Sequence, residues 1–328
     1  MVTLLAAAIL SPVSVSGWVV FWDGGASVRS FEQNVESVRE ACVEWVRADA
    51  NGLPVRRQQT DPESVKRFFA VARKNKVPLY VMTSNFQAPG GFQPGAVQAF
   101  LASEDKMRAH ARALVEIARK DGFQGIDLDY ESLDAADRDP YARFVEITAE
   151  ETKKARLKLS IAVHPKESEP GTWGGTQAQD YRRLGAAVDV FRVMTYDFSW
   201  DTSDAGPVAP APWVERVIRF TASVVPAKKI EVGIPGYGYN WKGKSGESIG
   251  WSDWTSLVAR YGPVSIDPVS REQVLKYEDR VAFFAAAESH RPKLDLVRTM
   301  KLRGVALWRF GTEDPAWWSL ARGEPRSQ

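Results

Sequence analysis

Three acidic side chains alternate with three apolar or aromatic ones in the segment 126–131. The acidic residues are Asp127, Asp129 and Glu131. Because successive side chains of a β-strand point to opposite faces, these carboxylates share one face, with neighbours about 6.6–7 Å apart. On a buried face they cannot all ionise comfortably, so we expect at least one proton to be retained near neutral pH. A protonated carboxyl at the end of a strand can act as a general acid, which predicts acid–base catalysis.

The elements around this segment decide where the carboxylates lie. Eight apolar, β-branched runs have the length of strands, and they are 17–22, 42–47, 78–83, 125–130, 158–163, 190–196, 230–234 and 304–309. Helical periodicity separates them, most clearly over 62–74 and 103–120. This alternation predicts the α/β class and a (β/α)8 TIM barrel. Active sites of that fold lie at the carboxyl ends of the strands, where Glu131 would stand.

An edge strand with a solvated acidic face is the alternative interpretation of segment 125–131. Such strands are common in antiparallel sheets. They fit poorly with a strand that has helices on both flanks, because parallel strands of α/β proteins are covered on both faces. We therefore favour the catalytic interpretation.

One interval breaks the rhythm of the predicted barrel. The seventh strand ends at Ile234 and the eighth begins at Gly304, a longer separation than any earlier one. The interval is rich in Tyr and Trp, and we interpret residues 236–290 as a small insertion over the barrel mouth. Residues 17–328 are thus expected to form one barrel domain with an insertion, rather than two domains.

Composition narrows the classes of function. The 328 residues carry 43 Lys and Arg against 41 Asp and Glu, and no basic stripe stands out, so we expect no nucleic-acid partner. One Cys and three His are too few for a disulfide framework or a dense metal cluster. Twelve Trp need either burial or a flat ligand. We expect a monomer without a membrane partner.

The N-terminal segment 1–16 is open to two interpretations. It is largely apolar, ends in small residues and carries no charge, and the first charged residue is Asp23. This pattern is typical of a signal peptide. The basic region with which signal peptides usually begin is missing, because segment 1–16 contains no Lys or Arg. The alternative is a trimmed start that leads directly into the first strand. Export would make the protein secreted or associated with the cell envelope.

Segment 124–131 resembles the catalytic motif of glycoside hydrolase family 18, which reads Asp-Gly-x-Asp-x-Asp-x-Glu on the fourth strand. Gln124 replaces the first Asp of the motif, and the other named positions match. Gln124 lies on the face opposite the carboxylates, so we expect a structural effect and retained activity. Segment 194–197, Met-Thr-Tyr-Asp, is similar to the family's Met-x-Tyr-Asp after the sixth strand.

Three further segments carry the resemblance. Segment 304–308 resembles the strand whose Trp forms the floor of the sugar site. Segments 17–22 and 234–239 resemble the bacterial branch that includes spore-cortex-lytic N-acetylglucosaminidases. The matches follow the family's order from the first strand to the eighth and cover nearly the whole chain.

The resemblance implies a retaining, substrate-assisted glycosidase. In this family the 2-acetamido oxygen of the substrate attacks the anomeric carbon, as an exception to the usual pair of carboxylates. Glu131 would protonate the leaving oxygen and later activate water. Asp129 would orient the acetamido N–H, with Asp127 sharing a proton or hydrogen bond beneath it. Tyr196 would donate a hydrogen bond to the acetamido carbonyl.

Further residues would bind the substrate, and the candidates are Asp197, Trp308, Met194, Trp22, Asn85 and Tyr237. Trp308 would form the apolar floor beneath the sugar at the cleavage point. Asn85 fits a sugar contact or a turn residue equally well. Tyr237 and Trp241 fit either stacking on sugars or burial inside the insertion. His164, which closes the fifth strand, is more typical of a structural hydrogen-bonding residue than of a catalyst.

The implied chemistry restricts the substrate. Without a 2-acetamido group there is no internal nucleophile, so the substrate should contain N-acetylglucosamine, as chitin oligomers and peptidoglycan do. Neither a metal ion nor an organic cofactor is required. The alternative function is a non-catalytic carbohydrate-binding protein on the same fold. Members of that kind typically lose the acid, which Glu131 supplies here.

Overall fold

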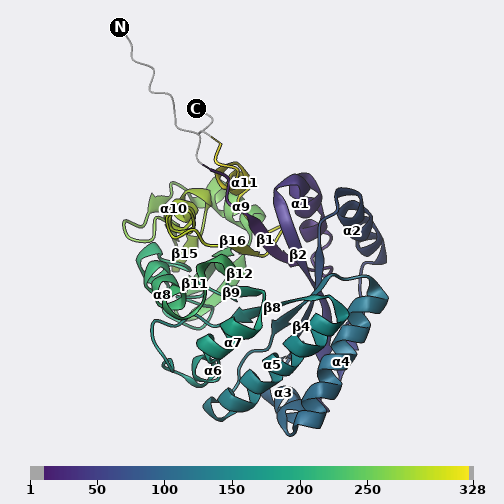
Figure 1. Cartoon of the computed structure of the whole chain (residues 1–328). Helices are drawn as coiled ribbons and strands as arrows, with labels where there is room; N and C mark the ends of the chain where they lie inside the picture. Colours follow the sequence, from purple (N-terminus) through teal and green to yellow (C-terminus); the bar gives the residue numbers. More distant parts are fainter. Residues whose placement is uncertain (1–10, 325–328) are drawn as a thin grey trace.

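The computed structural model describes residues 11–324 and contains a closed barrel of parallel strands (Figure 1). The eight strands, in order around the barrel, are β1 (Val15–Val19), β2 (Val38–Ala48), β4 (Leu79–Ser84), β7 (Gly125–Asp129), β8 (Lys158–Val163), β9 (Val190–Val193), β10 (Ile230–Pro235) and β16 (Gly304–Trp308). The barrel closes because β1 pairs in parallel with both β2 and β16. This arrangement confirms the predicted (β/α)8 barrel.

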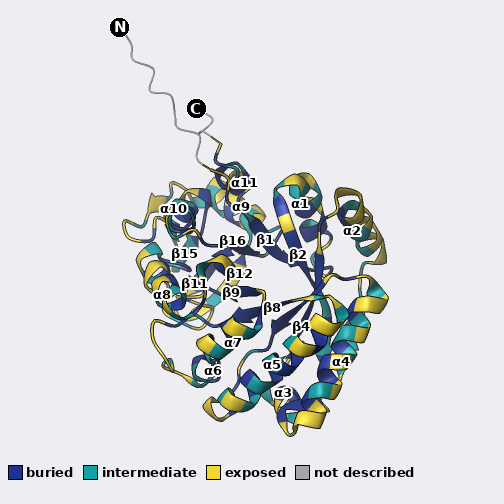
Figure 2. Cartoon of the chain, in the orientation of Figure 1, coloured by how far each residue is buried: buried dark blue, intermediate teal, exposed yellow. Residues whose placement is uncertain are grey.

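Helices follow the strands and cover the outside of the barrel (Figure 1). They are α1 (Ala26–Asn34), α2 (Pro62–Asn75), α3 (Pro94–Leu101), α4 (Glu104–Asp121), α5 (Arg138–Ala155), α6 (Gly174–Gln177), α7 (Tyr181–Ala187), α8 (Ala211–Val224), α10 (Arg291–Thr299) and α11 (Ala316–Ala321). Asp61 caps α2 by accepting a hydrogen bond from the backbone N–H of Ser64, and Ser103 caps α4 in the same way. Figure 2 shows that the strands are buried and that the exposed residues lie on the outer faces of the helices.

Short elements complete the barrel. They are β3 (Pro54–Arg56), which is antiparallel to β2, the hairpin of β5 (Phe86–Gln87) and β6 (Gly91–Phe92), and the 3-10 helices η1 (Val35–Ser37), η2 (Ala135–Asp137), η3 (Ala227–Lys229) and η4 (Ala287–His290). Within residues 11–324, no helix combines the length and hydropathy needed to cross a lipid bilayer.

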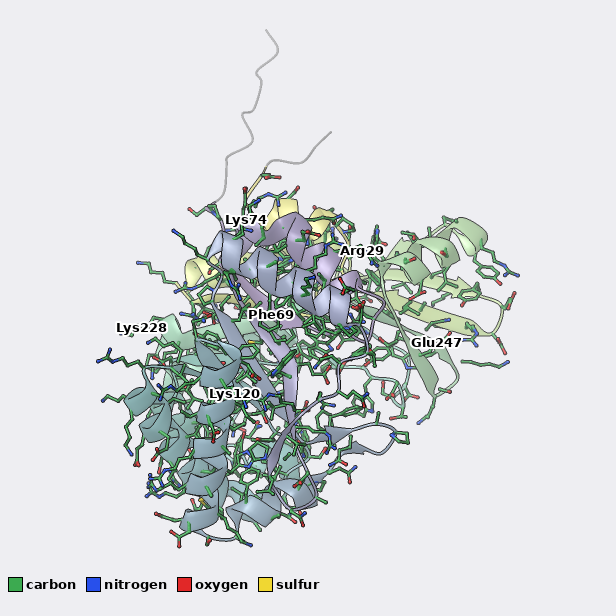
Figure 3. All side chains as sticks on the ribbon, turned by 90° about the vertical axis from the view of Figure 1, so that its right-hand side faces the viewer. Arg29, Phe69, Lys74, Lys120, Lys228 and Glu247 are labelled. Atoms are coloured by element: carbon green, nitrogen blue, oxygen red, sulfur yellow. The ribbon has the colours of Figure 1, made fainter. Side chains whose placement is uncertain are left out.

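Between β10 and β16 lies a second, antiparallel sheet. Its strands, in spatial order, are β12 (Ser245–Ile249), β11 (Gly238–Lys242), β15 (Arg280–Phe284), β14 (Gln273–Tyr277) and β13 (Ser265–Ile266), and α9 (Trp251–Tyr261) packs beside them. A separate small core supports it, with Trp254, Leu275 and Phe284 fully buried. In Figure 3 this insertion forms the lobe that carries Glu247.

The insertion is tied to the loop that follows β9. Trp241, in β11, donates its indole N–H to the backbone oxygen of Trp200 at 3.1 Å. The buried carboxylate of Glu272 accepts hydrogen bonds from the backbone N–H groups of Val208 and Ala209, both at 2.8 Å. The sequence allowed two interpretations of Trp241, stacking on sugars or burial inside the insertion. In the structure its side chain is buried at this junction.

The side-chain alternation in β7 is as predicted. The carboxylates point into the barrel, while Tyr130 packs outside it against Phe100 and Phe144. The hydroxyl of Tyr130 forms hydrogen bonds with Thr83 at 2.9 Å and with His110 at 2.7 Å. The outward half of β7 is therefore held by a small polar contact within an aromatic cluster.

Some strand ends differ from the prediction. β1 begins at Val15 and ends at Val19, because Val15 and Ser16 already pair with β16. β9 stops at Val193, since the backbone turns there and Thr195 N–H bonds back to Val193 O at 2.8 Å. Of the segment 1–16 predicted as a signal peptide or a trimmed start, residues 1–10 lie outside the described residues.

Candidate active site

The three acidic residues form a ladder from the interior of the barrel to its mouth. Asp127 is fully buried, Asp129 is 6% exposed, and the side chain of Glu131 is 19% exposed. Their order follows directly from the strand period, because each second residue of β7 points inward and stands further along the barrel axis. Glu131 therefore lies beyond the carboxyl end of β7, where a substrate could reach it.

Burial favours the protonated form in two members of the ladder. Burial raises the pKa of Asp129 to about 8, and the like charges of Asp127 and Glu44 add to this effect. Burial also raises the pKa of Glu131 well above its ordinary value, with further contributions from Asp129 and Asp197. Glu131 thus combines a raised pKa with a place at the mouth, as a general acid requires.

Asp127 has different partners from those expected. Its carboxylate accepts hydrogen bonds from Ser160 Oγ at 2.5 Å, Arg192 Nη1 at 2.7 Å and Trp18 Nε1 at 2.9 Å. The prediction that Asp127 shares a proton or hydrogen bond with Asp129 stays a prediction, because Asp127 Oδ2 accepts only the Trp18 hydrogen bond and can accept another. Asp129 Oδ1 is buried without a hydrogen-bond partner.

Asn85 was predicted to touch sugar or to form a turn, and the structure gives it another role. Its side chain is fully buried just after β4. Asn85 Oδ1 accepts from the backbone N–H of Glu131 at 2.9 Å, and Asn85 Nδ2 donates to the backbone oxygen of Glu131 at 2.8 Å. Since both ends of the amide are engaged, Asn85 positions the acid rather than contacting the sugar.

His164, at the end of β8, lies beside the acid. Its Nε2 atom is 3.6 Å from Glu131 Oε2 and has no hydrogen-bond partner. Burial lowers the pKa of His164 to about 4, so the imidazole is neutral at physiological pH. A neutral His164 adds no positive charge that would lower the pKa of Glu131.

Tyrosines surround the Met-Thr-Tyr-Asp segment after β9. Asp197 has a left-handed backbone, with φ of 55°, and accepts hydrogen bonds from Tyr237 at 2.5 Å and Tyr239 at 3.0 Å. Burial raises the pKa of Asp197, and the two hydrogen bonds oppose the rise. Tyr196 is buried with its ring edge-on to Tyr237. Tyr237 is thus largely committed to holding Asp197, a role that sequence analysis missed.

The tryptophans predicted near the substrate have different environments. Trp308 is partly exposed at the end of β16 and packs edge-on against Trp18, with centroids 5.6 Å apart. Trp22 is 58% exposed, and its indole N–H donates to Glu44 at 2.6 Å while the guanidinium of Arg309 lies over its ring. Met194 is buried directly after the end of β9.

More aromatic side chains are exposed in loops that follow barrel strands. They are Phe86 after β4, Trp173 after β8, and Phe198 and Trp200 after β9. Flat apolar rings left open to water are well suited to stacking on sugar rings. Trp173, Phe198 and Trp200 were not among the predicted substrate contacts. A Trp or Phe placed soon after a predicted strand was the sequence pattern that could have indicated them.

A parallel (β/α)8 barrel with buried carboxyls on one strand and aromatic rings around its mouth defines the class of barrel glycoside hydrolases. Residues 25–313 match the family model described as "Glycosyl hydrolases family 18". The chain therefore belongs to this family of hydrolases.

The relatives of the chain agree with this assignment. A Bacillus subtilis (strain 168) protein described as "Uncharacterized glycosylase YvbX" is 24% identical over 261 residues, covering 76% of each chain. The cortical fragment-lytic enzyme of the same organism is 29% identical over 265 residues, which cover 76% of this chain and 61% of that one. The chain thus spans less than two thirds of the latter relative.

A solved structure shares the fold over almost the full length. The crystal structure of the chitinase from Chromobacterium violaceum ATCC 12472 superposes with a TM-score of 0.86 at 26% identity, and the match covers 95% of this chain and 98% of that chain.

Proposed function

We propose that this protein hydrolyses beta-linked glycans containing N-acetylglucosamine, with retention of configuration and with the substrate's own acetamido group as nucleophile. The observation that carries the proposal is the line of carboxyls that begins in β7 and ends with Glu131 at the barrel mouth. The pKa of Glu131 is raised well above its ordinary value and that of Asp129 to about 8. A carboxyl that keeps its proton at neutral pH is a poor nucleophile, which favours an internal nucleophile from the substrate.

In the first step, Glu131 donates its proton to the glycosidic oxygen as the bond from that oxygen to the anomeric carbon breaks. The acetamido oxygen forms a bond to the same carbon, which yields an oxazolinium ion. Asp129 lies next to Glu131 on the same face and would accept a hydrogen bond from the acetamido N–H. Tyr196 would donate a hydrogen bond to the acetamido carbonyl. Trp308 would form the apolar floor beneath the sugar at the cleavage point.

In the second step, the Glu131 carboxylate takes a proton from water while the water oxygen bonds to the anomeric carbon. The oxazolinium ring opens, and the acid is restored for the next cycle. Asn85 would keep the Glu131 backbone fixed throughout, through its two hydrogen bonds. Asp197, held by Tyr237 and Tyr239, would bind the same sugar from the opposite side.

The substrate that we propose is either a chitin-type oligomer or peptidoglycan. One relative is named a cortical fragment-lytic enzyme and a structural neighbour is a chitinase, so both polymers fit the family's range. Both polymers lie outside the cell membrane. We therefore propose that the protein acts as a secreted or envelope-associated hydrolase.

The proposal is tested by incubating wild type and Glu131→Gln with N-acetylglucosamine oligomers and with purified peptidoglycan, in parallel. We expect wild type to release products from at least one of them, and Glu131→Gln to lose about 10²- to 10⁴-fold in turnover. Proton NMR of the first product formed should show the retained anomer. Equal binding of oligomers by both proteins without turnover would instead support the carbohydrate-binding alternative.

A further inference from the structure

Asp127 is held from three other strands of the barrel. Trp18 reaches it from β1, Ser160 from β8 and Arg192 from β9, at 2.9, 2.5 and 2.7 Å. All four side chains are almost completely buried. A carboxyl group that accepts three hydrogen bonds, one of them from a guanidinium, is held in one orientation.

The guanidinium that binds Asp127 belongs to a larger interior network. Arg192 also pairs with Glu40, and its Nε atom lies 2.9 Å from Glu231. Arg303 reaches the same two acids, at 2.6 Å from Glu40 and 2.9 Å from Glu231. Two guanidinium groups therefore face three buried acidic side chains, and Arg192 is the one that reaches Asp127.

Asp129 is the next carboxyl of the ladder toward the mouth. Its Oδ1 atom is buried and has no hydrogen-bond partner. The other charges that face Asp129 are those of Glu44 and Arg57, which pair with each other at 3.3 Å. An unpartnered buried carboxyl oxygen is costly, and a bound acetamido N–H would supply the missing donor.

We propose that Arg192 is a positioning residue for the reaction: it holds the Asp127 carboxyl in one orientation beneath Asp129, and so sets the position and the electrostatic environment in which Asp129 meets the acetamido group. The inference rests on the proposed function, since it concerns the same two aspartates. Arg192 contacts no substrate and acts through Asp127.

The electrostatic sign follows from the groups around Arg192. Its neighbours on β2 and β10 are Glu40 and Glu231, while burial raises the pKa of the nearby Cys42 thiol and of the Tyr80 hydroxyl, so both stay neutral. Removing the guanidinium removes a positive charge from a cluster of carboxylates. The protonated form of Asp129 then becomes more favourable, and the pKa of Asp129 rises further.

The test compares the pH dependence of kcat/KM for wild type, Arg192→Met and Arg192→Lys on an N-acetylglucosamine oligomer. We expect Arg192→Met to move the acidic limb upward by about one pH unit or more and to lower kcat more than it changes KM. Arg192→Lys keeps a charge but not the forked geometry, so it should restore part of the shift. Loss of stability alone would not move the profile.

Two further variants keep the test decisive if Arg192→Met fails to fold. Ser160→Ala removes one donor from Asp127 without removing a charge, and it should shift the limb in the same direction by a smaller amount. Arg303→Gln is the matched control, because it removes a guanidinium from the network while all three donors of Asp127 remain. It should leave the limb within about 0.3 pH unit.

Unchanged profiles in Arg192→Lys and Ser160→Ala, from proteins that turn over substrate, would overturn the role of Arg192 while the proposed function stands. A wild type inactive on every acetamido-bearing glycan would overturn the proposed function instead. In that case carbon-13 NMR of labelled aspartate carboxyls still tests Arg192. The Asp129 signal should titrate at higher pH in Arg192→Lys than in wild type, and equal titration in both would refute the inference.

Discussion

Replacing Asn85 by alanine tests how the acid is held in place. Asn85→Ala removes the two hydrogen bonds, of 2.8 and 2.9 Å, between the side-chain amide and the backbone of Glu131. A buried polar group left without a partner costs about 1–3 kcal/mol. Because Glu131 lies at the mouth and water can partly replace the amide, we take the lower end for each group. The free energy of unfolding should therefore fall by roughly 2 kcal/mol.

This loss can be followed by thermal unfolding, where it corresponds to a fall in Tm of roughly 3 °C. Catalysis should suffer more than stability does. Without the amide, the backbone of Glu131 is free to shift, and a misplacement of about 1 Å costs about 10²-fold in rate. We expect kcat on an N-acetylglucosamine oligomer to fall by about that factor, with little change in KM.

Gln87→Ala is the matched control. Gln87 lies two residues further along the same loop, and its amide bonds to Ala48 O at 3.3 Å rather than to Glu131. It should retain nearly all activity. A folded Asn85→Ala protein with kcat within about threefold of wild type, or an equal loss in both variants, would show that the hydrogen bonds to Asn85 do not position the acid.

Three other outcomes are expected. The raised pKa of Asp129 means that the folded chain holds a proton that the unfolded chain releases near pH 4, so stability should fall as the pH rises from about 4 toward 8. Asp129→Asn should flatten that dependence of Tm on pH, and parallel curves for the two proteins would contradict the assignment. Gln124→Asp should leave the rate and its pH profile unchanged, because the Gln124 amide bonds only to Leu79 N at 2.9 Å and Gly122 O at 2.6 Å; a clear gain in rate would show that Gln124 limits catalysis. Trp22→Ala should raise KM several-fold and spare kcat, as its exposed ring can stack on a sugar and its polar contacts are with Glu44 and Arg309 rather than with the acid; an equal loss in kcat would assign it to the chemistry instead.

Local pattern was sufficient to predict the barrel and the acidic ladder. Alternation within β7 assigned Asp127, Asp129 and Glu131 to one face, because the strand period is a property of consecutive residues. The same rule placed Tyr130 outside the barrel. Capping residues such as Asp61 also act within a few positions of the helix that they begin.

The partners of those residues could not be predicted, because they come from distant parts of the chain. Asn85 and Glu131 are brought together only by the pairing of β4 with β7. Arg192 reaches Asp127 across the barrel. A single basic residue in an apolar strand indicates a buried ion pair, but the sequence does not show which acidic residue is its partner. Which polar atoms meet inside a barrel depends on its closure and on the stagger of its strands, and these are properties of the whole sheet.

The junction between the insertion and the loop after β9 limits how this protein can be re-engineered. Residues from both ends of the insertion bind that loop, since Tyr239 and Trp241 hold Asp197 and Trp200, and Glu272 holds its far end. Replacing the insertion with one from another barrel would remove the hydrogen bonds that hold the loop after β9. A change of glycan preference by grafting would therefore require the insertion and this loop to be transferred together.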